Sequence, residues 1–184
     1  MDIDYGPLTG LLGTWRGDQG LDVSPEPDGS ELSPYYETIL FEGADNATNA
    51  ETQNLAVVRY HQAVFRKSND EQFHDQTGYW MWYAESGVVM QSLTIPRAVC
   101  VLAGGTYAAT DAADTKVVLE VAAKLGDDSW GIIQSPFMRD NARTVEFRHR
   151  ITLQGDKLSY AETTFLDIYG NSFDHTDENV LKRN

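Results

Sequence analysis

Hydrophobic and polar side chains alternate along much of this chain, which is the pattern of strands that bury one face. In residues 144–153 the side chains of Val145, Phe147, His149 and Ile151 fall on one face, and charged side chains fall on the other. Similar short segments, rich in β-branched and aromatic residues and separated by turn-forming residues, recur along the sequence. The pattern predicts strands at residues 35–42, 54–66, 73–83, 88–95, 98–103, 106–109, 116–123, 144–153 and 158–168.

Helix is nearly absent from this pattern. Residues 8–12 suit one helical turn, and the segment after Asp174 suits a short helix capped by Asp174 or Thr176. Residues 24–34 and 44–53 are rich in Pro, Gly, Asp and Asn and are predicted to be loops. We read residues 126–141 as a structured connection. Many short strands with turn signals between them indicate an all-β barrel or sandwich.

The run Gly13-Thr14-Trp15-Arg16-Gly17 suits the first strand of a small barrel that holds a ligand. Glycines allow sharp bending and a close approach of neighbouring strands. The indole of Trp15 is expected to close one end of the barrel. This interpretation predicts an interior cavity.

Composition narrows the class of partner. The chain has 184 residues, which suits a single domain over residues 1–184, and a formal net charge of −14. So acidic a protein is a poor partner for nucleic acid or for an anionic membrane surface, because lysine and arginine supply the attraction to phosphate. We therefore expect a small molecule as the partner.

Cysteine usage and the N-terminus indicate a location. Cys100 is the single cysteine and stands in an apolar run, which favours a buried thiol in a reducing compartment. Residues 1–5 lack the basic-then-apolar pattern of a signal peptide, and no apolar run is long enough to span a bilayer. These observations predict a cytoplasmic protein.

The four histidines are the main candidates for chemistry, since the motifs of zinc peptidases, nucleotide-binding loops and serine hydrolases are absent. Strand alternation makes His149 a core residue and His61 a surface residue. His74 shares a strand face with Gln76. Its position is equally compatible with two roles, which are lining a pocket and forming a hydrogen bond to a neighbouring residue. For His175 the residue types leave open a surface position or a neutral imidazole offered to a metal.

Four short motifs place the chain beside a known family. It resembles the nitrobindins, which are haem-binding β-barrels with a fold like that of the fatty-acid-binding proteins. The resemblance implies an up-and-down, lipocalin-like barrel of ten antiparallel strands, with haem b in a wide cleft. The motifs are Gly6-Pro7-Leu8 through Leu11-Leu12-Gly13-Thr14-Trp15-Arg16-Gly17, Phe73-His74-Asp75-Gln76-Thr77-Gly78-Tyr79, Gln91-Ser92 with Gly105-Thr106-Tyr107, and Gly155-Asp156-Lys157-Leu158-Ser159-Tyr160 followed by Asp174-His175 and Leu181.

The resemblance also implies a set of site residues. His175 matches the axial iron ligand of the family, and His74 and Gln91 match positions facing the other side of the haem. Thr38 matches a position that contacts haem, and Arg143 is placed to meet a haem propionate. The family is linked to nitric oxide binding and to the isomerisation of peroxynitrite to nitrate, so an enzymatic role is an open expectation. A homodimer is compatible with this fold, and nothing in the sequence decides for or against it.

One position departs from the apolar interior that the resemblance implies. Glu162 is in phase with Leu158 and Tyr160 and so points inward, where a carboxylate needs a partner such as Arg59 or Arg97, or else a raised pKa. An alternative function is therefore a haem-free carrier or sensor of a small hydrophobic or aromatic ligand. A barrel used only for protein association is a third.

Overall fold

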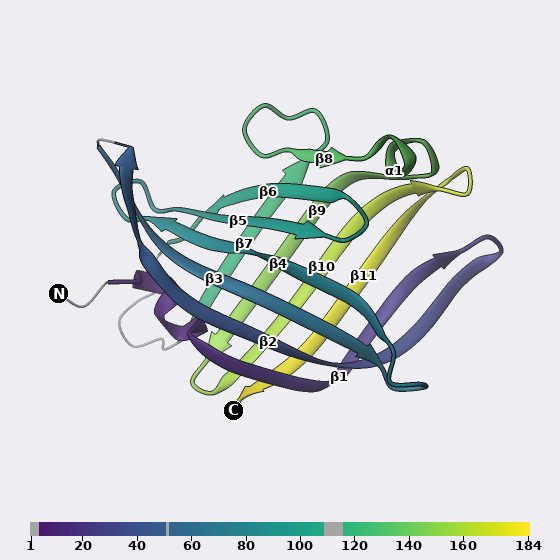
Figure 1. Ribbon diagram of the computed structural model, residues 1–184, viewed down its shortest axis with the longest axis horizontal. Helices are drawn as coiled ribbons and strands as arrows, with labels where there is room; N and C mark the ends of the chain where they lie inside the picture. The colour runs from purple at the N-terminus through teal and green to yellow at the C-terminus, as the bar shows by residue number, and fades with distance from the viewer. Residues whose placement is uncertain (1–3, 51, 109–115) are drawn as a thin grey trace.

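The computed structural model describes residues 4–50, 52–108 and 116–184, and these form one closed antiparallel barrel. Successive strands are neighbours around the barrel, and the pairing of β5 with β6 and of β1 with β11 completes the ring (Figure 1). The strands are β1 (Gly13–Glu26), β2 (Gly29–Ala50), β3 (Gln53–Arg66), β4 (Gln72–Tyr83), β5 (Val88–Ile95), β6 (Val99–Thr106), β7 (Lys116–Lys124), β8 (Ile132–Gln134), β9 (Ala142–Gln154), β10 (Lys157–Ile168) and β11 (Asn171–Arg183).

Ten of these strands form the closed ring, and the short β8 pairs with β6 and places Ile132 in the core. The all-β, ten-stranded fold is therefore confirmed. Helix is limited, in the described residues, to η1 (Gly6–Leu11) and α1 (Pro136–Asn141). Neither is long and apolar enough to cross a membrane.

The prediction of a helix after Asp174 is wrong. That segment belongs to β11, which pairs along its length with β10 and, at residues 176–178 and 182–183, with β1. The residue types there suited a helix cap, and the segment lacks the hydrophobic alternation of a strand. That alternation is missing because the barrel interior on this side is itself polar. Asn179, for example, is buried there and donates a hydrogen bond to Glu37.

Two predicted loops are also strands. Residues 24–26 and 29–34 extend β1 and β2 into a long paired hairpin, and residues 44–50 continue β2 toward β3 (Figure 1). Their polar composition fits loops, but cross-strand pairing satisfies their backbone groups. Residues 24–32 of the first hairpin are exposed or half-buried, so this hairpin needs no hydrophobic alternation.

Two expectations for β6 are corrected as well. Gly104 and Gly105 do not form a turn, and β6 runs through them, with the Trp130 ring and the β7 backbone in the space where their side chains would lie. The separate strand predicted at residues 106–109 is wrong for its described part, since Thr106 ends β6 and residues 107–108 are not in a strand; residue 109 lies outside the described residues. Cys100 is exposed, because its neighbours Val99 and Val101 take the inward positions.

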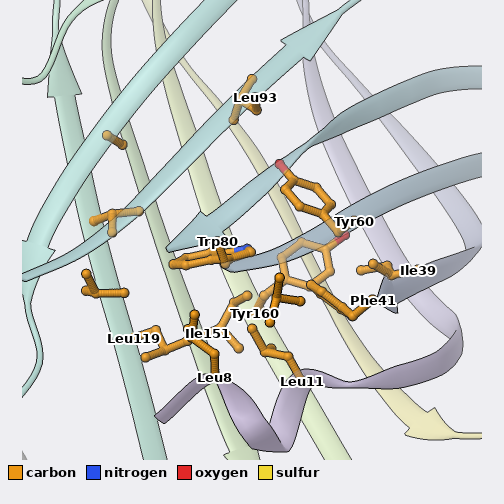
Figure 2. Close-up of a cluster of buried hydrophobic side chains, with 14 of the residues drawn as sticks. Leu8, Leu11, Ile39, Phe41, Tyr60, Trp80, Leu93, Leu119, Ile151 and Tyr160 are labelled. Carbon is orange, nitrogen blue, oxygen red and sulfur yellow. The ribbon is translucent and has the colours of Figure 1, made fainter. Parts of the chain in front are cut away.

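Trp15 closes one end of the barrel, as the sequence predicted. It is fully buried, its Nε1 donates to the Leu11 carbonyl at 2.6 Å, and the Arg183 guanidinium lies 4.3 Å from its ring centre. Figure 2 shows Leu8 and Leu11 of η1 directed into the core beside Ile151. The apolar core thus fills the half of the barrel next to η1 and leaves the other half available for a site.

Candidate functional site

A cavity of about 1250 Å³ occupies the half of the barrel opposite η1. This volume exceeds that of most small-molecule pockets, so a large planar ligand has room there. One wall is apolar, from Leu93, Val101 and Phe147 together with Met138 of α1. A polar wall is formed where β1, β10 and β11 contribute Asp22, Glu162, His175 and Asp177 to the lining. The rim of the cavity carries four arginines, Arg66, Arg97, Arg139 and Arg143.

The polar wall holds a row of titratable side chains in adjacent strands. Cross-strand register places His149 opposite Glu162, Glu162 opposite Asp177, and Asp177 opposite Asp22. Glu162 lies 3.6 Å from His149 Nδ1 and forms no ion pair with Arg59 or Arg97, contrary to the pairing considered from the sequence. Three carboxylates therefore share one belt inside the barrel.

His175 projects into the cavity beside this row. Its Nε2 lies 2.6 Å from Asp22 Oδ1 and 3.5 Å from Asp177 Oδ2. Burial opposes protonation of the imidazole, but the hydrogen bond to Asp22 and the surrounding negative charges outweigh it and raise the pKa of His175. The protonated His175 ring is therefore held in place by the carboxylates of Asp22 and Asp177 and not by contacts with water.

Burial also shifts the carboxyl groups of the row. It raises the pKa of Glu162 to about 8, with the charge of Asp177 adding to the shift. Burial likewise raises the pKa of Asp177 to about 7, although the neighbouring His175 acts in the opposite direction. The wall thus holds protons near neutral pH, where ordinary carboxyl groups have none.

A hydrogen-bonded chain joins two of the predicted site residues. His74 Nε2 donates to Gln76 at 3.3 Å, and Gln76 donates to the Tyr60 hydroxyl at 2.7 Å. Gln91 donates to the same hydroxyl at 2.9 Å and accepts from His149 Nδ1 at 2.9 Å. Burial lowers the pKa of His149 to about 3, which keeps its ring neutral, and its Nε2 has no partner among the described residues.

A third cluster of polar side chains surrounds Glu37. The sequence analysis did not identify Glu37 as a site residue. Its Oε1 accepts from the Tyr160 hydroxyl at 2.9 Å and from Asn179 at 2.7 Å, and its Oε2 accepts from Gln62 at 2.6 Å. Burial raises the pKa of Glu37 to about 7 even though these donors act to lower it. Strand alternation with Tyr35 and the buried Ile39 was the signal that could have revealed Glu37 as an inward carboxylate.

Glu37 makes stability fall as pH rises. Its pKa is higher in the folded chain than the ordinary 4.5, so the folded state holds the extra proton between about pH 4.5 and 7. The stability that Glu37 contributes through this proton is complete below this pH window and lost above it. Through Glu37 the free energy of unfolding changes by on the order of 3 kcal/mol across the window. We expect Glu37→Gln to remove roughly that share of the wild-type decline in urea-unfolding free energy between pH 4.5 and 7.5 and to leave the share that comes from Glu162 and Asp177. Glu42→Gln, an exposed change on the same strand, should keep the wild-type slope, and an unchanged slope in Glu37→Gln would contradict this account.

The structure brings together some of the sequence-predicted site residues and separates others. His74, Arg143 and His175 line the cavity, and Arg143 contacts Asp167 at 2.5 Å on the rim. Gln91 is fully buried beneath the cavity. Thr38 is half-buried on the face of β2 opposite the inward-pointing Glu37, and so it does not join the others. Asp22 and Asp177, which directly contact His175, were not identified from the sequence.

Comparison with known proteins identifies the family. The sequence model described as the THAP4-like, heme-binding beta-barrel domain matches residues 4–183. The chain belongs to this family of haem-binding β-barrels. The fold of the solved structure of Rv2717c from M. tuberculosis is similar, with a TM-score of 0.70 at 21% sequence identity over 96% of this chain and 94% of that one. Curated protein sequences contain no match to this chain.

Membership of this family confirms the resemblance to haem-binding barrels that the four motifs indicated. The matched range runs from before η1 to the end of β11, so the family match includes both walls of the cavity. Haem is therefore the ligand that this family leads us to expect in the cavity.

Proposed function

We propose that this barrel binds haem b in its large cavity, with His175 as the axial ligand of the iron. The observation that carries the proposal is a half-buried histidine projecting into a cavity of about 1250 Å³, in a chain of a haem-binding family. Histidine is a common proximal ligand of haem iron.

The other wall and the rim suit the rest of the group. The apolar wall provides the surface that a macrocycle needs, and Met138 adds a polarizable side chain. Of the rim arginines, Arg143 is the family-matched candidate for a propionate, although Asp167 already holds it. A guanidinium can bridge two carboxylates, because it offers five donors.

The chain's own residues prepare the ligand. Only a neutral imidazole can bind a metal, so Asp22 would accept the ring proton that His175 carries on its other nitrogen. His74, held by Gln76, offers a neutral imidazole elsewhere on the cavity lining, because burial lowers its pKa. Bound ferric haem would supply an open coordination position, and by family resemblance nitric oxide binding and peroxynitrite isomerisation to nitrate are the reactions to test.

Ferric haem titration tests the proposal. Wild-type protein should develop a Soret band that saturates at one haem per chain, and His175→Ala should lose that band or bind at least tenfold more weakly. His61→Ala is the matched control, because His61 lies on the outer surface beside Asp75 and its loss should leave the titration unchanged. Equal binding by wild type and a folded His175→Ala would refute the axial assignment.

A haem-free carrier of a small hydrophobic ligand is the second candidate, favoured by the same apolar wall. It predicts that apolar aromatic compounds raise the melting temperature of the protein while ferric haem gives no Soret band. Thermal shift and absorbance on one sample therefore separate the two functions.

A further inference from the structure

Asp22, His175 and Asp177 form a compact group that contains three donor atoms for a metal. Asp22 on β1 lies directly opposite Asp177 on β11, and His175 lies two residues before Asp177 on the same strand face. One ligand atom from each residue lies within 4.8 Å of the others. All three side chains line the cavity, so an ion can reach them.

The donor atoms of this group are held close together and away from other cations. Among the described residues, no lysine or arginine forms an ion pair with Asp22, Asp177 or Glu162. Asp22 contacts both His175 and Asp177, and its side chain retains only 4% exposure. The Asp22 and Asp177 oxygens and the His175 ring nitrogen are thus neighbouring donor atoms available to a cation from outside the chain.

We propose that Asp22, His175 and Asp177 bind a divalent transition-metal cation directly, without haem. One imidazole and two carboxylates are a donor set that suits Zn²⁺, Mn²⁺, Fe²⁺ or Co²⁺. Ligand atoms about 2 Å from a tetrahedral ion lie roughly 3.3 Å apart. The distances from His175 Nε2 of 2.6 Å to Asp22 and 3.5 Å to Asp177 are close to this spacing, so only a small movement of Asp22 is needed.

Three protein ligands leave at least one coordination position of the ion free, as in catalytic zinc sites. That position faces the cavity, which gives a bound ion access to water and to small ligands. Glu162 stands opposite Asp177 in the next strand and is placed to bind such a water. The site is thus open rather than structural.

This inference is independent of haem binding, although both assign a metal to His175. The ion and haem iron would compete for the same imidazole, so only one can occupy it at a time. Co²⁺ binding without haem binding would leave the inference standing and refute the proposed function. Haem binding without Co²⁺ binding would do the reverse.

The test is a titration of chelator-treated protein with Co²⁺, followed by its visible absorbance, and with Zn²⁺ by calorimetry. Wild type should bind one ion per chain, while Asp22→Asn and Asp177→Asn should each bind at least tenfold more weakly. Asp174→Asn is the matched control, because it removes an exposed carboxylate from the same strand, and it should bind within twofold of wild type. Pre-loading with Zn²⁺ should also lower the apparent affinity for haem.

Folding of the variants is checked by the melting temperature without metal. Asp177→Asn should melt no lower than wild type, because it removes one of two opposed carboxylates, yet it should lose the metal-induced rise in melting temperature. Metal binding that survives in both folded aspartate variants, or that falls equally in Asp174→Asn, would overturn the inference. Failure of wild type to bind either metal would overturn it as well.

Discussion

Replacement of Trp15 by Ala is expected to lower the free energy of unfolding by about 4 kcal/mol. The indole is fully buried between η1 and the barrel wall, and its removal leaves a cavity that the closed barrel cannot collapse to fill. Such a loss is a large share of the roughly 5–15 kcal/mol that stabilises an ordinary domain. Thermal unfolding should show a melting temperature roughly 8–16 °C lower.

The hydrogen bond of Trp15 can be separated from its packing. Trp15 Nε1 donates to the Leu11 carbonyl, whereas the buried Nε1 of Trp82 has no partner among the described residues. Trp15→Phe should therefore cost about 1–3 kcal/mol more than Trp82→Phe, which removes an unsatisfied donor. Equal costs for the two substitutions would show that the Trp15 hydrogen bond contributes nothing net.

Replacement of Gly78 by Ala should be at least as damaging as the loss of an ordinary core side chain. A Cβ at Gly78 would lie 1.9 Å from the Ser92 carbonyl oxygen of β5 and 3.0 Å from Leu93 Cα. These are backbone atoms, so β4 and β5 would have to separate beside Gln76 and Trp80. We expect a loss of about 3 kcal/mol or more, measured by urea unfolding, or failure to obtain folded protein.

Gly10→Ala is the control for the change in backbone freedom. A Cβ at Gly10 meets only Leu153 Cδ1 at 3.4 Å, an ordinary contact. We expect this variant to unfold within about 1 kcal/mol of wild type. A Gly78→Ala protein as stable as Gly10→Ala would mean that the two strands can move apart freely.

The strands that bury one face were predictable from the sequence, because alternation reports burial directly. Residues 147–153 illustrate this, since Phe147, His149 and Ile151 are all buried, whereas a register shift at Val145 leaves it half-buried and buries Thr144 instead. The segment of β11 after His175 was not predictable in the same way. Its inward residues include Asp177 and Asn179, and a polar inner face gives no hydrophobic signal.

The candidate site was only partly predictable for a related reason. The histidines stand out by their chemistry, and the inward phase of Glu162 follows from its spacing to Leu158 and Tyr160. Asp22 is one of many acidic residues in a chain of net charge −14, in a segment whose composition fits a loop. Nothing local distinguishes it from the others.

The family resemblance implied the barrel, whereas the sequence by itself determined an all-β chain in which His149 and Glu162 face the interior. These follow from side-chain periodicity and residue type, which are local properties. Only the tertiary structure decided that Asp22 and Asp177 meet His175 in the cavity. Asp22 and His175 are 153 positions apart, and their contact depends on closure of the barrel by β1 and β11 in one particular register. A shift of that register by one residue would turn one side chain of each pair away from the cavity.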